Sequence, residues 1–572
     1  MAKFARKFFN SNAEFTTIGN GSLGGKAQGL ADISRVLTEK FTPDTFPGIS
    51  VSIPHMTVLT TEVFDDFMNL NQLYEIALST EPDHRIAHAF INANFPAKMV
   101  GDLYALTAEV KSPLAIRSSS LLEDALFEPF AGIYGTKMTP NNQFDTETRF
   151  HKLIEAIKYV YASTFFKDAK DYFLATKHAI AEEKMAVIIQ EIVGQRHQDY
   201  FYPDISGVAR SYNFYPMGAA KPEDGIVSLA LGLGKAIVDD GISWSYSPAF
   251  PRANPPYSNI GELMSQTQHY FWAVNMAKLN VYDPVKETEY LLKLDSSMAD
   301  ENKSLKYLAS TYDSGSDRIY PGVSAGGTKI ITFAPLLDLQ QLPLNDLIKT
   351  LLKITEESTR TPVEIEFAAT LEFNNELMAR FGFLQVRPMV VSKEIIEISA
   401  EEMYDDNMVV ASDNVLGNGS MDYLCDIVYV KPESFQAKST PQIALEIEKI
   451  NQTLREQETS YVLIGFGRWG SSDPWLGIPA NWGQISQTKV IVESSLPEMN
   501  VDLSQGSHFF HNLSSFQISY FAIKHSGKYK INWNWLNQQT MVQETEFVRH
   551  IKLLSPLTVK VDGRTGVGVI KK

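Results

Sequence analysis

The pattern of apolar and polar residues predicts a protein built of both helices and strands. Residues 185–189 (MAVII) form a continuous apolar run, which is typical of a strand buried on both faces of a sheet. Apolar and polar residues alternate over 362–368 (PVEIEFA) and again over 383–388 (FLQVRP), which predicts two strands about a hairpin apart. Residues 147–184 carry a long amphipathic pattern that predicts helix. We therefore expect a fold of the α+β class.

A glycine-rich loop at residues 19–25 leads into apolar residues at helical spacing over 30–37. Lys26 therefore lies at or just before a helix N-terminus, where loop amides, the helix dipole and an ammonium group converge and favour an anion. The loop is not a Walker A sequence, because Ala27 follows Lys26. A plain turn with no ligand is the alternative.

Each of the two alternating strands presents polar side chains on one face: Glu364 and Glu366 on the first strand, Gln385 and Arg387 on the second. Carboxylate and amide oxygens suit a Mg²⁺ ion that bridges phosphates, and an arginine suits a phosphoryl group in transfer. The alternative is a pair of amphipathic strands whose polar residues face solvent.

The segment 114–135 begins as an apolar strand end and continues into a loop rich in hydroxyl groups. Arg117 follows the strand, and three serines follow at 118–120. A planar guanidinium together with hydroxyl donors such as Ser118 suits a triphosphate. An ordinary serine-rich turn after a strand is the alternative.

Composition narrows the class of protein. The chain has 572 residues, too many for one hydrophobic core, which indicates two to four domains. Its net charge of −16 disfavours nucleic acid and anionic membranes as partners. Cys425 is the single cysteine, so we expect no intrachain disulfide, no Cys-rich zinc site and a cytoplasmic location. Residues 1–15 lack the apolar core of a signal peptide, and no apolar run approaches the ~20 residues that span a bilayer.

Several of these segments resemble, in family order, the N-terminal AMP/ATP-binding domain of the phosphoenolpyruvate synthase and pyruvate phosphate dikinase family. The resemblance covers roughly residues 16–390 and rests on an ordered set of motifs rather than on any one of them. The matching stretches are residues 24–27 (family G-G-K-G), 117–124 with 130–134 (R-S-S-A-x-x-E-D…F-A-G-x-Y), 185–193 (M-A-V-x-V-Q-x-M-V), 206–208 (S-G-V), 232–234 (G-L-G), 364–367 (D-I-E-W/F) and 384–388 (L-Q-x-R-P).

Some residues near the expected phosphate site depart from the family pattern. Arg210 and Ser211 stand where the family has Phe-Thr, Lys235 replaces an acidic residue, and Glu364 stands for an aspartate. Arg210 and Lys235 add positive charge, which predicts either altered chemistry or altered salt bridging.

The resemblance implies that three residues are catalytic. Lys26 and Arg117 would hold the phosphates of ATP, and Arg387 would stabilise charge that develops during phosphoryl transfer. Ser118 and Glu364 would add contacts to the nucleotide.

The resemblance also assigns the adenine and the metal. Gln190, Glu191 and Ile192 would lie along the adenine edge, at the end of the apolar strand. Glu366 and Gln385 would hold Mg²⁺. ATP and Mg²⁺ are therefore the expected cofactors.

The implied fold is an ATP-grasp-like nucleotide-binding domain of two subdomains, residues 1–184 and 185–395, followed by a smaller α/β domain over 396–572. None of the 11 histidines stands in the family's phosphohistidine motif, G-G-x-T-S-H-A. About 180 residues follow Pro388, short of the ~250 of a pyruvate-binding barrel. We therefore expect both of those domains to be missing.

Residues 396–572 match no motif. Glycine-rich loops occur at 461–479 and 505–513, and this region holds five of the seven tryptophans, namely Trp469, Trp475, Trp482, Trp533 and Trp535. Such loops predict a ligand-binding surface. The alternative is an aromatic-rich core or a contact between copies in a homo-oligomer.

Two functions remain open. The first is an ATP-dependent phosphotransferase that, by resemblance, transfers the β-phosphoryl group and leaves AMP and phosphate. Its acceptor or partner protein is unidentified, because the usual histidine is missing. The second is a non-catalytic ATP-binding regulatory or scaffold protein. The retained set of Lys26, Arg117, Glu366, Gln385 and Arg387 favours the enzyme. An antibiotic or sugar kinase resembling rifampicin phosphotransferase or glucan water dikinase is a weaker idea, because those enzymes also use the phosphohistidine.

Overall fold

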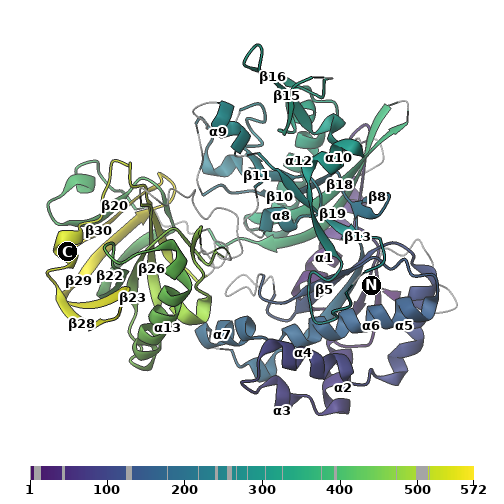
Figure 1. The fold of residues 1–572 in the computed structure, drawn as a ribbon, viewed down its shortest axis with the longest axis horizontal. Helices are drawn as coiled ribbons and strands as arrows, with labels where there is room; N and C mark the ends of the chain where they lie inside the picture. The colour runs from purple at the N-terminus through teal and green to yellow at the C-terminus, as the bar shows by residue number, and fades with distance from the viewer. Residues whose placement is uncertain are drawn as a thin grey trace.

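The computed structural model describes residues 1–572 except 1, 5–14, 42–44, 124–131, 177, 215, 217, 239–241, 254–259, 266, 280, 303, 325, 375, 392–395, 472, 474, 497–512 and 514–515. The described chain mixes helices and strands throughout its length (Figure 1), as its hydrophobic pattern predicts. Among the described helices, none is both long enough and apolar enough to cross a lipid bilayer.

The first of two six-stranded sheets contains the predicted buried strand. The apolar run forms β7 (Met185–Glu191), which lies between two antiparallel neighbours and has a continuous buried stretch. In spatial order the strands are β1 (Ala2–Lys3), β2 (Phe15–Ile18), β4 (Met56–Leu59), β7, β5 (Leu114–Ser120) and β6 (Thr136–Thr139). The helices of this part are α2 (Thr61–Asn71), α3 (Tyr74–Ala77), α4 (Asp83–Asn92), α5 (Ala97–Glu109), α6 (Thr146–Ser163) and α7 (Lys167–Ala175).

The second six-stranded sheet contains the two predicted alternating strands as an antiparallel pair. In spatial order its strands are β12 (Trp244–Tyr246), β11 (Ile226–Ala230), β10 (Ile205–Arg210), β18 (Val363–Asn374), β19 (Glu376–Pro388) and β3 (Ile49–Ser52). Helix α12 (Leu344–Thr359) packs its apolar stripe against this sheet. The predicted pairing of the two strands is therefore confirmed.

Helix α1 (Gly24–Lys40) lies between the two sheets. Its buried residues Leu30 and Ile33 belong to one hydrophobic cluster with Ile188 of β7 and Val386 of β19. Lys26 lies in the first turn of this helix, as the glycine-rich loop predicts. The helix thus joins the sheets and places its N-terminal turn between them.

Smaller elements surround the second sheet. One four-stranded sheet consists of β14 (Leu291–Asp295), β13 (Tyr270–Asn275), β9 (Tyr200–Tyr202) and β8 (Gln195–His197), and a three-stranded sheet of β16 (Arg318–Pro321), β15 (Ala309–Asp313) and β17 (Thr328–Ile331). The short helices are α8 (Lys235–Val238), α9 (Ile260–Ser265), α10 (Ser296–Glu301) and α11 (Ala334–Leu337), with 3₁₀ turns η1 (Ile180–Glu182), η2 (Pro222–Asp224) and η3 (Ser304–Tyr307).

The C-terminal region, residues 396–572, contains a nine-stranded mixed sheet (green to yellow in Figure 1). Its strands in spatial order are β20 (Met408–Ser412), β30 (Val567–Lys571), β29 (Val548–Asp562), β22 (Asn418–Val430), β23 (Tyr461–Phe466), β26 (Thr488–Ser494), β27 (Ser519–Ile523) and β21 (Val415–Leu416), with β28 (Thr540–Glu544) beside β29. The other elements are α13 (Thr440–Glu456), α15 (Trp533–Leu536), β24 (Arg468–Trp469), β25 (Gly477–Ile478), η4 (Glu402–Tyr404), η5 (Ala437–Ser439) and η6 (Trp482–Ile485).

The tryptophans of the C-terminal region are mostly part of its core. Trp469 and Trp482 are buried, and Trp533 and Trp535 pack against the apolar side of the large sheet. Trp475 is 69% exposed. The interpretation as an aromatic-rich core thus describes four of the five tryptophans. Residues 505–512 of the second glycine-containing loop lie outside the described residues.

The C-terminal region packs against α7, which lies beside it in Figure 1. Asn481 Nδ2 donates to Asp171 Oδ2 at 3.0 Å, and the ring of Phe516 lies 5.1 Å from that of Tyr172. Gly483 approaches so closely that a Cβ atom there would lie 2.5 Å from the Cβ of Asp171. One hydrophobic cluster therefore spans both parts of the chain.

Sheet membership does not follow the predicted boundary at residue 184. Strand β7 lies after that residue but pairs within the first sheet, and β3 lies before it but pairs with β19 in the second sheet. Each sheet thus contains one strand from the segment of the chain that was predicted to form the other subdomain. The division into 1–184, 185–395 and 396–572 stays a prediction.

Candidate functional site

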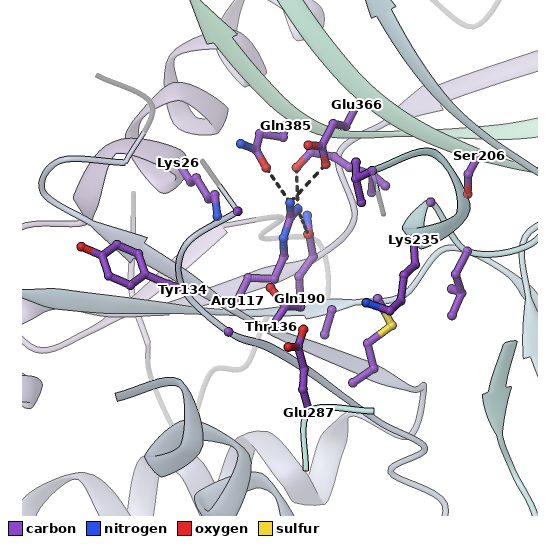
Figure 2. Close-up of a pocket in the computed structure, with 18 of the residues that line it drawn as sticks. Lys26, Arg117, Tyr134, Thr136, Gln190, Ser206, Lys235, Glu287, Glu366 and Gln385 are labelled. Carbon is purple, nitrogen blue, oxygen red and sulfur yellow. Dashed lines mark hydrogen bonds and ion pairs between the residues drawn. The ribbon is translucent and has the colours of Figure 1, made fainter. Parts of the chain in front are cut away.

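A cavity of about 750 Å³ lies between the two six-stranded sheets (Figure 2). Its size is within the range of small-molecule sites. It gathers eight of the ten residues predicted from the sequence: Lys26, Arg117, Gln190, Glu191, Ile192, Glu366, Gln385 and Arg387. The other two, Ser118 and Glu364, are buried and do not line it. These eight residues, from Lys26 to Arg387 in the sequence, thus converge on one cavity, as an ordered set of motifs predicts.

Arg117 reaches from the first sheet to the second. It stands mid-strand in β5, which continues through Ser120, so the prediction that a loop begins at Arg117 is wrong. Its guanidinium donates to the backbone oxygen of Leu384 at 3.0 Å and to Gln385 Oε1 at 2.6 Å. The same group lies 3.3 Å from Glu366 Oε2 and 3.4 Å from Gln190 Oε1. Figure 2 shows this convergence at the centre of the cavity. A planar guanidinium has several donors in a fixed arrangement, which is why one side chain can hold four acceptors.

A β-bulge supplies one of these acceptors. Glu366 pairs with Gln385 and Phe367 pairs with Phe383, so Leu384 is the extra residue on β19. An extra residue in a ladder is left without a cross-strand partner. Its backbone carbonyl oxygen is therefore available, and it accepts a hydrogen bond from the guanidinium of Arg117.

The two polar pairs that alternation predicts lie directly opposite each other across β18 and β19. Glu364 pairs with Arg387, and Glu366 pairs with Gln385. Arg387 contacts both carboxylates, with its Nη2 at 3.0 Å from Glu366 Oε1 and its Nε at 3.2 Å from Glu364 Oε1. These residues face the cavity or the layer just beneath it rather than bulk solvent, so the solvent-facing alternative is wrong.

The charge of Glu366 is maintained by its neighbours. Burial disfavours the charged form, but the guanidiniums of Arg117 and Arg387 outweigh it and hold the pKa of the Glu366 carboxyl below its ordinary value. The side chain is therefore an anion at neutral pH.

Arg210 explains one departure from the family pattern. It lies opposite Glu364 across β10 and β18, and its Nε is 2.6 Å from Glu364 Oε2. Ser211, the neighbouring departure, accepts a hydrogen bond from the backbone nitrogen of Val363 at 2.9 Å. The sequence left open whether the added positive charge alters the chemistry or the salt bridges. For Arg210 it alters the salt bridges, because this residue pairs with Glu364. Lys235 lies elsewhere on the cavity wall, with its ammonium 5.7 Å from the centre of the Trp272 ring.

The Lys26 ammonium is held by a buried carboxylate. It lies 2.7 Å from Glu123 Oε1 and 3.3 Å from Ser118 Oγ. Glu123 in turn accepts from the backbone nitrogen of Ser120 at 2.9 Å, and Ser120 Oγ accepts from the backbone nitrogen of Glu123 at 3.1 Å. This reciprocal pair has the geometry of a capping box. It closes the loop and directs Lys26 towards the cavity.

The serines at the end of β5 form hydrogen bonds within the protein, to Glu123 and to the glycine-rich loop. Ser118 is fully buried and donates to Glu123 Oε1 at 2.8 Å, so its predicted contact with phosphates is not supported by its position. Ser119 Oγ donates to the backbone oxygen of Leu23 and accepts from the nitrogen of Ala27. Gly24 has a φ of +73°, and a Cβ there would lie 1.7 Å from the oxygen of Ser119. The serines thus dock the glycine-rich loop onto β5. Asp124, Phe130 and Ala131 of the same motif lie outside the described residues.

A second carboxyl lies behind this loop. Glu183 is 3% exposed, and burial raises its pKa to about 7, against opposing hydrogen bonds from Ser120 and the backbone of Leu121 and Leu122. The nearby charge of Glu123 raises the pKa further. The segment 120–123, which holds Lys26 through Glu123, therefore lies beside a carboxyl whose pKa is near neutral pH.

The end of β7 forms one wall of the cavity, where the adenine edge is predicted. Glu191 also bonds away from the cavity: its Oε2 accepts from Ser112 Oγ at 2.5 Å and its Oε1 lies 3.5 Å from His55 Nδ1. The backbone nitrogen of Ile192 donates to the oxygen of Pro113 at 2.9 Å. Apolar side chains that flank this wall are Met138, Leu233 and Leu291.

Three lining or supporting residues carried no assigned role in the sequence. Glu123 stands in the matched family motif, which was its only signal. Glu287 lines the cavity, and its carboxylate lies 3.4 Å from the backbone nitrogen of Thr136. Gly470 lines it from the C-terminal region. Gly470 belongs to the glycine-rich loop at 461–479, which the sequence predicts as part of a ligand-binding surface, whereas no local pattern marks Glu287.

The oxygens of Glu366 and Gln385 fit Mg²⁺. Both converge on one cationic nitrogen of Arg117, so they already form a site for positive charge. Within the described part of the chain, no group of three or more His, Cys, Asp or Glu side chains gathers as a metal cage. Mg²⁺ is commonly held by one or two carboxylates together with water and phosphate, which such a set suits.

Of the comparisons with known proteins, the search of curated proteins finds no match, whereas a protein family matches most of the chain. The family described as "Pyruvate phosphate dikinase, AMP/ATP-binding domain" matches residues 20–408, which is more than half of the chain and includes the whole cavity except Gly470. Because that family matches so much of the sequence, and the matched motifs meet at one cavity, the chain belongs to the family of the pyruvate phosphate dikinase AMP/ATP-binding domain.

Proposed function

We propose that this chain is an ATP-binding phosphotransferase whose nucleotide lies between the two six-stranded sheets, in an ATP-grasp-like arrangement of two subdomains. The observation that carries the proposal is the convergence of Arg117 from the first sheet with Glu366, Gln385 and Arg387 from the second. A site that closes from two sides around phosphates is suited to transfer rather than to binding alone, because it can surround the reacting group.

The balance of charge at this end of the cavity favours an anion. Arg117, Arg210 and Arg387 face the two carboxylates of Glu364 and Glu366. Three positive groups against two negative ones leave an excess of positive charge in a partly buried setting, where Coulomb interactions are stronger than in water. Lys26, whose charge Glu123 balances, adds a directed donor.

Phosphoryl transfer depends mainly on positioning and on stabilising charge. Lys26 and Arg117 would orient the phosphates, and Arg387 would face the group in transfer. Glu366 and Gln385 would hold Mg²⁺, which when bound supplies positive charge against the phosphates. Glu366 is suited to that role because Arg117 and Arg387 keep its pKa low despite its burial.

The base of the nucleotide would lie along the end of β7. Gln190, Glu191 and Ile192 line the wall there, and Met138 and Leu233 offer apolar surface for a ring. Glu364 would act from beneath the cavity by fixing Arg387, since its carboxylate lies 3.2 Å from Arg387 Nε.

The acceptor stays open in this proposal. We place the C-terminal region, as a separate α/β domain, beside the cavity because Gly470 lines it. It is therefore a candidate surface for an acceptor molecule or a partner protein.

Product analysis tests the proposal. The protein is incubated with Mg-ATP, and phosphorus NMR identifies the products, while calorimetry measures ATP binding. AMP and phosphate support the dikinase-like reaction, and ADP indicates a simple kinase. ATP binding with no product over hours, even when a cell extract is added as a source of acceptors, leads to the non-catalytic binding protein instead. Absence of ATP binding refutes the nucleotide site itself.

A further inference from the structure

One nitrogen of Arg117 stands between the two proposed metal ligands. Its Nη2 lies 2.6 Å from Gln385 Oε1 and 3.3 Å from Glu366 Oε2 (Figure 2). The other nitrogen, Nη1, is anchored by the backbone oxygen of Leu384 at 3.0 Å. The oxygens that fit a metal ion are therefore engaged by a cation that belongs to the chain itself.

A guanidinium and a metal ion compete for these oxygens. Both neutralise the Glu366 carboxylate, and both need the lone pair of Gln385 that faces the cavity. The side chains are only 14% exposed for Arg117 and 19% for Glu366, so a metal ion and a guanidinium that share these two oxygens would repel each other more strongly than in water. One of them has to move before the other can bind.

A phosphate chain gives Arg117 a second place to bind. Arg117 lines the cavity, and phosphate oxygens accept strong, paired hydrogen bonds from a guanidinium. Turning towards a phosphate would release Glu366 Oε2 and Gln385 Oε1. A metal ion that arrives alone offers Arg117 no such acceptor, so Nη2 would lose Glu366 and Gln385 without compensation.

We propose that Arg117 gates the metal site. In the absence of nucleotide its guanidinium holds Glu366 and Gln385, and an incoming phosphate chain draws it away so that the metal ion binds with the nucleotide rather than before it. This inference rests on the proposed Mg-ATP site. It predicts that removal of the guanidinium opens the oxygens to a divalent ion with no nucleotide present.

The test measures Mn²⁺ binding to the full chain by electron paramagnetic resonance, without nucleotide. Arg117→Met removes the charge but keeps an unbranched side chain. We expect the wild-type protein to bind Mn²⁺ weakly at this site and Arg117→Met to bind it at least tenfold more tightly. The double variant Arg117→Met with Glu366→Gln should lose that gain, which locates the ion at Glu366 rather than at another acidic group.

Lys26→Met is the matched control. It removes one positive charge from the same cavity, but Lys26 pairs with Glu123 at 2.7 Å and leaves the contacts of Arg117 in place. We expect its Mn²⁺ affinity to stay within threefold of wild type. An equal gain in Lys26→Met and Arg117→Met would overturn the proposal in favour of a general effect of net charge.

Two further outcomes overturn the proposal. One is tight Mn²⁺ binding by the nucleotide-free wild-type protein that Glu366→Gln abolishes. The other is unchanged Mn²⁺ binding in Arg117→Met. Because Arg117 joins the two sheets, circular dichroism and melting confirm the fold of each variant, and Arg117→Gln, an uncharged amide, replaces Arg117→Met if the latter does not fold. ATP binding to the wild-type protein is measured separately by calorimetry. Its absence would refute the proposed function, while the metal experiment, which uses no nucleotide, would still report on the gate.

Discussion

Glu366→Gln tests the phosphate end of the cavity with a change of one atom. It removes the negative charge of the side chain and turns one carboxylate oxygen into an NH₂ group. In the folded chain, Glu366 accepts from Arg387 Nη2 at 3.0 Å on one oxygen and from Arg117 Nη2 at 3.3 Å on the other. Glutamine can accept from only one of these donors, so the other guanidinium then faces an NH₂ group. An unsatisfied buried donor costs about 1–3 kcal/mol, which is the destabilisation we expect.

The effect on turnover should exceed the effect on ATP affinity. Loss of one preorganised group that stabilises charge in the transition state lowers turnover about 10²–10³-fold, or about 2.7–4 kcal/mol. ATP affinity measured without metal should change less than tenfold, because Lys26 and the wall formed by Gln190, Glu191 and Ile192 are untouched.

The assay measures product formation over a range of Mg²⁺ concentrations, ATP binding by calorimetry in the presence of EDTA, and thermal melting. If no acceptor yields wild-type turnover, the dependence of ATP affinity on Mg²⁺ is the readout. We expect the wild-type protein to bind ATP more tightly with Mg²⁺ than without it, and Glu366→Gln to lose most of that difference.

Glu364→Gln is the matched control. Glu364 stands two residues earlier on the same strand, also between two guanidiniums, with Arg210 Nε at 2.6 Å and Arg387 Nε at 3.2 Å, but it does not line the cavity. We expect a similar loss of stability and a smaller loss of turnover. Equal turnover losses would attribute the effect to destabilisation, and normal turnover in Glu366→Gln would show that the metal assignment is wrong.

Three further predictions concern the surroundings of the site. Gly483→Val should lower the melting temperature and weaken ATP binding severalfold. The reason is that even a Cβ atom at this position would lie 2.5 Å from the Cβ of Asp171. An unchanged melting temperature and unchanged ATP binding in calorimetry would contradict this. Burial raises the pKa of Glu183 to about 7, so the folded chain holds that proton more tightly than the unfolded one, and stability falls as pH rises from about 4.5 to 7. At pH 8 the free energy of unfolding of Glu183→Gln should therefore exceed that of the wild type by up to about 3 kcal/mol, and its melting temperature should be higher. This difference should shrink towards pH 5. A difference in melting temperature that does not change with pH would rule this out. Gly24→Ala should reduce ATP affinity at least tenfold, because its Cβ would lie 1.7 Å from the oxygen of Ser119, and normal binding in calorimetry would disprove it.

The sequence determined the local elements of the site well. The apolar run at 185–189 forms the centre of a doubly buried strand, and the alternating runs form β18 and β19. Side-chain direction in a strand depends only on the period of two along the backbone. For that reason the facing of Glu364, Glu366, Gln385 and Arg387 could be predicted without any knowledge of the fold.

The serine run at 118–120 shows where local reasoning stops. The sequence predicts a loop whose hydroxyl groups suit phosphates, yet these residues form the end of strand β5, and Ser118 and Ser119 bond to Glu123 and to the glycine-rich loop. A hydroxyl binds whichever partner packing brings to it, and the glycine-rich loop that approaches here begins more than 90 residues earlier in the chain. Its placement could not be derived from spacing.

The sequence by itself determined which residues are candidates for the chemistry, through the hydrophobic pattern, the charged positions on it and the resemblance to one family. Only the tertiary structure decided which partners those residues contact in the folded chain. Arg117 meets Glu366 and Gln385 across 249 and 268 residues of sequence, and the bulge at Leu384 provides its anchor. Gly470 joins the cavity because α7 packs against the C-terminal region. Such contacts depend on how sheets and helices pack together, and the period of a single strand or helix carries no information about the surface that it will meet.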